Sequence, residues 1–236
     1  MLEKLKEDVL LANKKLQTDK LVELTWGNVS GRDPESGLIV IKASGVEYQD
    51  MTVSDLVVVD PDGTTVEGEC NPSTDLDTHL VLYRHFKNIH GVVHTHSHYA
   101  TIWAQAGKGI PCYGTTHADY FPGTIPVTRL MAADEINGNY EKNTGDVIVE
   151  TFKETDPEVM RAVLVRCHGP FVWGSSALDA IHNAVVLENV AMMALNTQMM
   201  LGSKKSLVTK ELLKKHYDRK FGENAYYGQY HAEARR

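Results

Sequence analysis

Residues 91–96 read GVVHTH, an apolar run that ends in two histidines, His94 and His96. Short runs of β-branched residues favour β-strands. Because side chains alternate between the two faces of a strand, residues two apart project from the same side. Ser97 follows and is suited to cap a helix that extends to about Ala106. The stretch therefore predicts a strand that presents two imidazoles together, followed at once by a helix.

Similar patterns extend outward on both sides of this stretch. Apolar residues at three- and four-residue steps predict an amphipathic helix over residues 2–17. Strands are predicted at 37–42, 56–59 and 163–168, the last ending in His168 and stopped by Gly169-Pro170. Further helices are predicted over 73–86, 178–200 and 210–221, with Ser73 or Thr74 as the first N-cap. Strands and helices are mixed along the chain, which predicts one α/β domain.

The composition is that of an ordinary globular protein. The chain has 236 residues, of which 42% are hydrophobic and 23% are charged, and this excludes collagen, a coiled coil and intrinsic disorder. The formal net charge is −7 with no basic block, which argues against a nucleic-acid partner. The N-terminus carries charges throughout, so we expect no secretory signal there.

Two further features bear on location. The most apolar stretch, Ala177–Leu201, contains Asp179, His182 and Glu188, so a buried helix is expected there and not a membrane span. The three cysteines, at positions 70, 112 and 167, are far apart and odd in number. This pattern favours reduced thiols and a cytoplasmic protein.

The histidines and one carboxylate suggest a metal site. His94, His96 and His168 end predicted strands, and Asp75 lies where the helix before the first of these strands begins. Three imidazoles and a carboxylate can hold one ion, zinc first, with manganese or another divalent metal as the alternative. Spacing alone leaves other interpretations open. The histidines could be surface or hydrogen-bonded residues, and Asp75 could be a helix-start carboxylate.

Several short motifs occur in an order that is recognisable. They are TWGNVS at 25–30, KASG at 42–45, STD at 73–75, HTHS at 94–97, GTTHADY at 114–120, HGP at 168–170 and AYYGQ at 225–229. Together they resemble the class II sugar-phosphate aldolase and epimerase family. The resemblance implies a single three-layer α/β/α domain over residues 1–229, with a mixed, mostly antiparallel central sheet. Residues 230–236 extend beyond it and are expected to form a disordered tail without an assigned role.

The resemblance also implies the site residues. The metal, zinc, would be held by Asp75, His94, His96 and His168. The phosphate would be bound by Gly27, Asn28, Lys42, Ser44, Gly45, Ser73 and Thr74. Glycine lets the backbone approach an anion, and amides and hydroxyls donate hydrogen bonds to it. The chain has no GxGxxG and no Walker A motif, so nucleotide binding is not supported.

Within the family the motifs are most similar to those of the sugar-phosphate 4-epimerases. The resemblance therefore implies interconversion of L-ribulose 5-phosphate and D-xylulose 5-phosphate. Because the C4 hydrogen is not alpha to the C2 ketone, simple enolisation cannot remove it, and the implied route is retro-aldol cleavage and re-addition. Asp119 and Tyr227 would transfer the protons, the tyrosine coming from a neighbouring subunit of a homotetramer with sites at its interfaces. His216 is a further candidate for the pocket.

Two alternatives belong to the same fold. The first is an aldolase that cleaves fuculose- or rhamnulose-phosphate, in which a glutamate usually occupies the position of Asp75. The second is a non-catalytic scaffold, as in the family's cytoskeletal relatives, which lack the metal ligands. The aspartate and the complete ligand set favour the epimerase. Arabinose catabolism and ascorbate-type sugar catabolism both use this reaction, and the sequence does not distinguish them.

Overall fold

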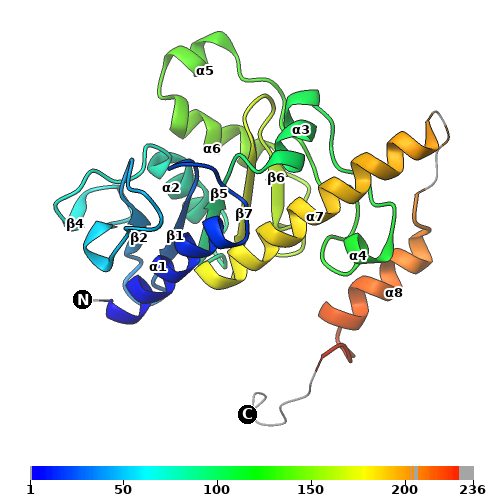
Figure 1. Ribbon diagram of the computed structural model, residues 1–236, viewed down its shortest axis with the longest axis horizontal. Helices are drawn as coiled ribbons and strands as arrows, with labels where there is room; N and C mark the ends of the chain where they lie inside the picture. The colour runs from blue at the N-terminus through cyan, green and yellow to red at the C-terminus, as the bar shows by residue number, and fades with distance from the viewer. Residues whose placement is uncertain (1, 203, 205–206, 229–236) are drawn as a thin grey trace.

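A computed structural model of the protein describes residues 2–202, 204 and 207–228 (Figure 1). Its centre is a seven-stranded sheet in the order β4-β3-β2-β1-β5-β7-β6. The strands are β1 (Asn28–Arg32), β2 (Ile39–Lys42), β3 (Leu56–Val59), β4 (Thr65–Glu67), β5 (Gly91–His94), β6 (Ala162–Leu164) and β7 (Pro170–Gly174). All paired strands are antiparallel, and parallel pairing within the described residues is limited to an isolated bridge between Val127 and Leu164. The predicted α/β class and mostly antiparallel sheet are confirmed.

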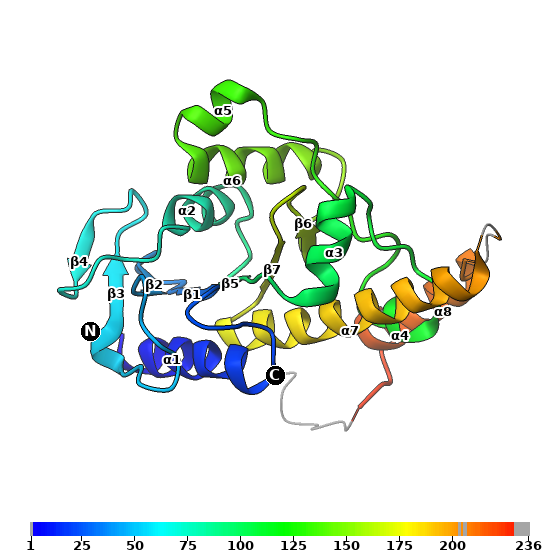
Figure 2. The ribbon, with the colours of Figure 1, turned by 45° about the horizontal axis from the view of Figure 1, so that its top comes forward.

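Helices cover both faces of the sheet, which gives the three layers seen edge-on in Figure 2. Helices α1 (Glu3–Thr18) and α7 (Ala177–Leu201) lie on one face, and α2 (Leu76–His85) and α6 (Tyr140–Thr151) on the other. The remaining helices are η1 (Val53–Asp55), α3 (His98–Ala106), α4 (Thr115–Ala118), α5 (Ala133–Asn137) and α8 (Lys210–Phe221). The expected domain boundary at residue 229 and the expected tail at 230–236 lie outside the described residues.

The central strands are buried along their whole length. Strands β2, β3, β5 and β7 have no exposed residue, and helices lie on both faces of the sheet. This explains why their sequences are continuous apolar runs and do not alternate. Their register aligns Asn28 of β1 with His94 of β5, and His94 with Phe171 of β7. The ends of three neighbouring strands therefore meet at one edge, where β1 and β5 contribute Asn28 and His94 and the site forms.

Helix α7 is the element predicted as a buried helix and not a membrane span. Among the described residues it alone is long and apolar enough, by length and composition, to cross a membrane. Its buried residues, which include Ala180, Ile181 and Leu187, belong to the side that packs against α1, β5 and β7. The helix therefore supplies core to the sheet, as expected for the long helix of a layered α/β domain.

Three predicted details near the histidines are wrong. Strand β5 ends at His94, so His96 lies in the connection to α3 and not in the strand. His168 does not end a strand either. It lies in the tight turn between β6 and β7, where the N–H of Val165 donates to Gly169 O at 2.8 Å. Gly169-Pro170 does not stop the sheet, because Pro170 is the first residue of β7, a position that needs no backbone donor.

The helix starts also differ from the prediction. Helix α2 begins at Leu76 after Asp75 as N-cap, so neither Ser73 nor Thr74 caps it. Ser97 is the N-cap residue of α3, as predicted, but its side chain makes no capping bond. Instead the carboxylate of Glu188, on α7, accepts the N–H groups of Tyr99 at 2.8 Å and Ala100 at 3.0 Å. A residue about ninety positions away thus caps the N-terminus of α3 in place of a local side chain.

Candidate active site

A cavity of about 400 Å³ opens at this edge of the sheet. It is lined by every residue that the resemblance assigned to the phosphate and the metal: Gly27, Asn28, Lys42, Ser44, Gly45, Ser73, Thr74, Asp75, His94, His96 and His168. Four lining residues were not predicted, namely Thr25, Trp26, Tyr140 and Glu141. Residues from six separate segments of the chain therefore converge on one space.

Three imidazoles face one another in this cavity. The nitrogen atoms that His94, His96 and His168 could offer a metal all lie within 4.8 Å of one another. The His94 ring stacks on Phe171, with 4.2 Å between centroids, and its Nδ1 lies 3.0 Å from Pro170 O. A ring that donates from Nδ1 to a carbonyl keeps Nε2 free as the ligand atom.

Asp75 lies beside the triad and is held in place by an amide. The Asn28 Nδ2 group donates to Asp75 Oδ2 at 2.7 Å and to Ser73 Oγ at 2.9 Å. Burial opposes ionisation of this carboxyl, but His94, His79 and the Asn28 amide outweigh it and lower the pKa of Asp75. The carboxylate is therefore ionised at neutral pH.

The same surroundings keep imidazoles neutral. Burial, together with His94 and His96, lowers the pKa of His168 to about 3. Burial, and to a lesser extent His94, also lowers the pKa of His96. Metal ions bind neutral imidazoles and ionised carboxylates. The three clustered imidazoles, with the ionised Asp75 lining the same cavity, supply the kinds of donor atom that a divalent ion of the zinc type binds.

Another part of the cavity lining has the groups that hold an anion. We call Gly27, Lys42, Ser44, Gly45 and Thr74 the anion-binding wall. Within the described residues, the N–H groups of Gly27, Gly45 and Thr74 donate no hydrogen bond. The hydroxyls of Ser44 and Thr74 make none with this part of the chain either. Lys42 is only 2% exposed, and its ammonium donates to Ala43 O at 3.2 Å. Burial lowers the pKa of Lys42. Unused donors beside a buried cation are the features of a phosphate site.

Gly27 connects the anion-binding wall to His94, the first of the predicted metal-binding histidines. Its φ of +78° lies in the left-handed region, and a Cβ there would meet His94 O at 2.7 Å and Val22 Cγ1 at 2.9 Å. Only glycine fits this position without displacing the β5 backbone. The loop before β1 therefore packs directly on the strand that carries the first histidine.

The two predicted proton-transfer residues lie elsewhere. Asp119 follows α4, and Tyr227 follows α8, and neither lines the cavity. Figure 1 places α4 and α8 together beside the outer end of α7. Arg219 of α8 joins the pair: its guanidinium bonds both Asp119 oxygens, at 2.8 and 2.6 Å, and lies 5.0 Å from the centre of the Tyr227 ring. We call Asp119, His216, Arg219 and Tyr227 the α8 cluster.

His216 completes the α8 cluster. Its Nδ1 lies 3.0 Å from Asp119 Oδ1, so the predicted involvement of His216 is with Asp119 and not with the histidine triad. Burial of the Asp119 carboxyl is outweighed by its bonds to Arg219 and His216, which lower its pKa. The carboxylate is thus held ionised and fixed in orientation.

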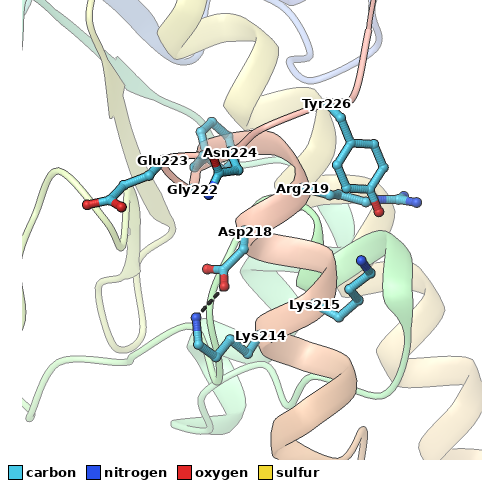
Figure 3. Close-up of a pocket in the computed structure, with 9 residues that line it drawn as sticks. Lys214, Lys215, Asp218, Arg219, Gly222, Glu223, Asn224 and Tyr226 are labelled. Carbon is cyan, nitrogen blue, oxygen red and sulfur yellow. Dashed lines mark hydrogen bonds and ion pairs between the residues drawn. The ribbon is translucent and has the colours of Figure 1, made fainter.

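A second, larger cavity of about 730 Å³ adjoins the α8 cluster. Figure 3 shows Arg219 and Tyr226 on one side of it and the Lys214–Asp218 ion pair on another. None of the residues predicted for phosphate or metal lines this space. Within one chain, the two halves of the predicted active site are therefore separate.

Some of the unpredicted residues had a sequence signal and others had none. Thr25 and Trp26 open the TWGNVS motif, so their position on the cavity wall could have been anticipated. Tyr140 and Glu141 begin α6 and belong to no quoted motif. The Tyr140 hydroxyl lies 3.4 Å from His168 Nδ1, a contact that depends on α6 lying over the β6–β7 turn. No local pattern encodes it.

Known proteins match the chain along most of its length. The family described as Class II Aldolase and Adducin N-terminal domain matches residues 7–195. The chain is 53% identical over 230 residues to the L-ribulose-5-phosphate 4-epimerase UlaF of Salmonella paratyphi B, which covers 97% of this chain and 100% of the relative. The enzyme of the same name from Salmonella typhi matches with the same identity and coverage.

Solved structures agree with the fold. An L-fuculose 1-phosphate aldolase has a TM-score of 0.78 at 24% identity, covering 93% of this chain and 97% of its own. The L-fuculose 1-phosphate aldolase from Glaciozyma antarctica has a TM-score of 0.74 at 17% identity, covering 91% of this chain and 80% of its own. Identities this low support a common architecture and not a common substrate.

Proposed function

The chain belongs to the class II aldolase and adducin family, and on this premise we propose that it is a cytoplasmic, zinc-dependent L-ribulose-5-phosphate 4-epimerase. The observation that carries the proposal is that one cavity is lined both by His94, His96, His168 and Asp75 and by the anion-binding wall. The identity of 53% to relatives named as this epimerase supports the choice of substrate.

We assign the metal to Asp75, His94, His96 and His168. A divalent ion held there would act as a Lewis acid that stabilises negative charge developing on the C2 and C3 oxygens of the sugar. The protein's part is to keep His96 and His168 neutral and Asp75 ionised. Asn28 contributes by orienting the carboxylate, since its side-chain amide donates hydrogen bonds to both Asp75 and Ser73.

We assign the 5-phosphate to the anion-binding wall together with Asn28 and Ser73. The buried ammonium of Lys42 supplies the charge, and the unused N–H and O–H groups supply direction. Holding the phosphate anchors the fragment that leaves on cleavage. An anchored glycolaldehyde phosphate stays in the cavity and can recombine, whereas a released one would make the enzyme an aldolase.

The bond that breaks is C3–C4. Removal of the C4 hydroxyl proton gives glycolaldehyde phosphate and the enediolate of dihydroxyacetone. Rotation of the aldehyde presents its other face, the C3–C4 bond forms again, and a proton returns to the new C4 oxygen. Two groups are therefore needed, one for the C4 hydroxyl of each epimer, and we assign these roles to Asp119 and Tyr227.

Assembly explains how these two groups reach the sugar. Neither lines the cavity of its own chain, yet Arg219 holds them together in one cluster. We infer that the α8 cluster of one subunit completes the cavity of its neighbour in a homotetramer. A head-to-tail contact that closes into a ring gives every subunit one donor surface and one acceptor surface.

Mixed oligomers test this arrangement. His96→Asn damages the metal side, and Tyr227→Phe damages the α8 cluster, so each variant alone should turn over L-ribulose 5-phosphate poorly. When equal amounts are dissociated and reassembled together, about a quarter of the sites pair an intact metal half with an intact α8 cluster. Recovery of activity to about that fraction is expected. No recovery from a fully mixed oligomer would show that each chain completes its own site.

A further inference from the structure

Tyr48 lies behind the anion-binding wall and is completely buried, with 0% of its surface exposed. Its hydroxyl lies 2.7 Å from two consecutive carbonyls, Trp26 O and Gly27 O, and its one proton is shared between them. Its ring lies under Lys42, whose ammonium is 5.0 Å from the ring centre. One side chain thus contacts both the loop and the cation of the wall, although it does not line the cavity itself.

The hydroxyl determines where the Gly27 N–H points. The carbonyl of Trp26 and the N–H of Gly27 belong to the same peptide unit, which is planar and trans, so the two groups point in opposite directions. Holding the carbonyl toward Tyr48 therefore turns the N–H away from Tyr48. This N–H has no acceptor among the described residues, and Gly27 lies on the cavity wall. The bond from Tyr48 thus keeps a donor available to a ligand.

The ring serves the cation without neutralising it. In the described part of the chain the Lys42 ammonium forms no ion pair, Glu47 raises its pKa only from beyond ion-pair distance and less than burial lowers it, and its hydrogen bond is to a neutral carbonyl. A carboxylate partner would stabilise the buried charge but would compete with an incoming anion. The face of an aromatic ring attracts a cation and leaves its charge to the ligand. Tyr48 therefore supports Lys42 in a form that can still bind phosphate.

We propose that Tyr48 is the positioning residue of the anion-binding wall, its hydroxyl directing the Gly27 N–H and its ring supporting Lys42 for a phosphate group. The inference rests on the proposed function in taking phosphate as the anion. It predicts a loss confined to anion binding. The metal ligands lie on other elements, so metal content should be unaffected.

Inorganic phosphate is the probe, titrated into the metallated protein by calorimetry and used as a competitive inhibitor of turnover. Tyr48→Phe removes the hydroxyl and keeps the ring. Leaving the Trp26 and Gly27 carbonyls without this donor should weaken phosphate binding and raise KM by about tenfold, with kcat changed less than about twofold. The matched control is Tyr83→Phe, which removes another buried phenol hydroxyl, bonded to Ser30 Oγ at 2.8 Å. This control should bind phosphate as the wild type does.

Lys42→Met tests the phosphate site separately from the role of Tyr48. Wild-type affinity in Tyr48→Phe, with weakened binding in Lys42→Met, would overturn the role of Tyr48 and leave the phosphate site standing. Equal affinity in Lys42→Met and the wild type would overturn the phosphate site as well. A measurement on the unaltered protein guards against a variant that does not fold. With glycine labelled by ¹⁵N, phosphate should shift the Gly27 amide resonance, and an unshifted resonance at saturation would contradict the inference.

Discussion

Replacing Gly27 by alanine should destabilise the protein by about 2–5 kcal/mol. Two costs add. The first is the backbone conformation, since φ at Gly27 is +78° and a left-handed residue with a Cβ costs about 1–2 kcal/mol. The second is steric, because the new Cβ would lie 2.7 Å from His94 O and 2.9 Å from Val22 Cγ1. Overpacking of this kind costs about 1–3 kcal/mol.

Gly45→Ala is the matched control for this experiment. Gly45 has a φ of +71°, yet nothing lies within 4 Å of the position its Cβ would take. It therefore shares the backbone cost of about 1–2 kcal/mol and lacks the steric one. The difference between the two variants isolates the contact with the β5 backbone.

Urea unfolding of the metal-free proteins, at one protein concentration, measures both values. Gly27→Ala should have the lower midpoint with an unchanged m-value, and it should also bind zinc more weakly, because His94 must move. Equal destabilisation by the two substitutions would refute the reasoning, since it would mean that the loop yields freely and does not couple the wall to the metal side.

Three further results are expected. Removing the metal with a chelator should lower the melting temperature. Zinc at about 100–1,000 times its dissociation constant should restore about 3–4 kcal/mol of unfolding free energy. An unchanged melting temperature would contradict a bound metal. Burial outweighs the bond to Gly123 O and lowers the pKa of His117 to about 4. Below about pH 6.5 the unfolded chain therefore binds a proton at this histidine before the folded protein does. The free energy of unfolding should then fall by up to about 1.4 kcal/mol for each pH unit. His117→Gln should lose less stability than the wild type between pH 6.5 and 4.5, as measured by denaturant titration. Glu188→Ala removes the acceptor of the Tyr99 and Ala100 N–H groups and should cost about 1–3 kcal/mol, whereas a cost near zero would show that water replaces the carboxylate.

Periodicity and turn residues predicted much of the fold correctly. The helices at residues 2–17, 178–200 and 210–221 and the strand at 56–59 match α1, α7, α8 and β3 to within one residue at each end. Helices α1 and α7 bury apolar residues against the sheet, β3 is a continuous apolar run, and α8 is bounded by Thr209 as N-cap and Gly222 as C-cap; all of these patterns are local. Strand β7 was missed because Gly169-Pro170 is usually a breaker, whereas here it turns the chain from one strand into its antiparallel neighbour.

The candidate site was predicted for a reason that differs in part from the structural one. His94 and His96 were expected to meet by strand alternation, but only His94 is in the strand. They meet because the chain leaves β5 at the same edge where the β6–β7 turn delivers His168. Such convergence depends on strand order, which no local pattern contains. It entered the prediction through the resemblance of ordered motifs.

The α8 cluster marks the limit of sequence reasoning here. The motifs at 114–120 and 225–229 pointed to Asp119 and Tyr227, but not to Arg219, which bonds the one and contacts the other. Glu188 was missed for the same reason, since its partners lie about ninety positions away. Long-range polar pairs carry no periodicity, so they become visible only when the elements are assembled.

Turnover of L-ribulose 5-phosphate tests the central claim most directly. The metallated protein should convert it to D-xylulose 5-phosphate, lose this activity to a chelator and regain it with zinc, without accumulation of free aldehyde. Failure of the fully metallated protein to convert either pentulose phosphate, with release of an aldehyde from a deoxyketose 1-phosphate, would contradict the epimerase and identify an aldolase that uses the same site.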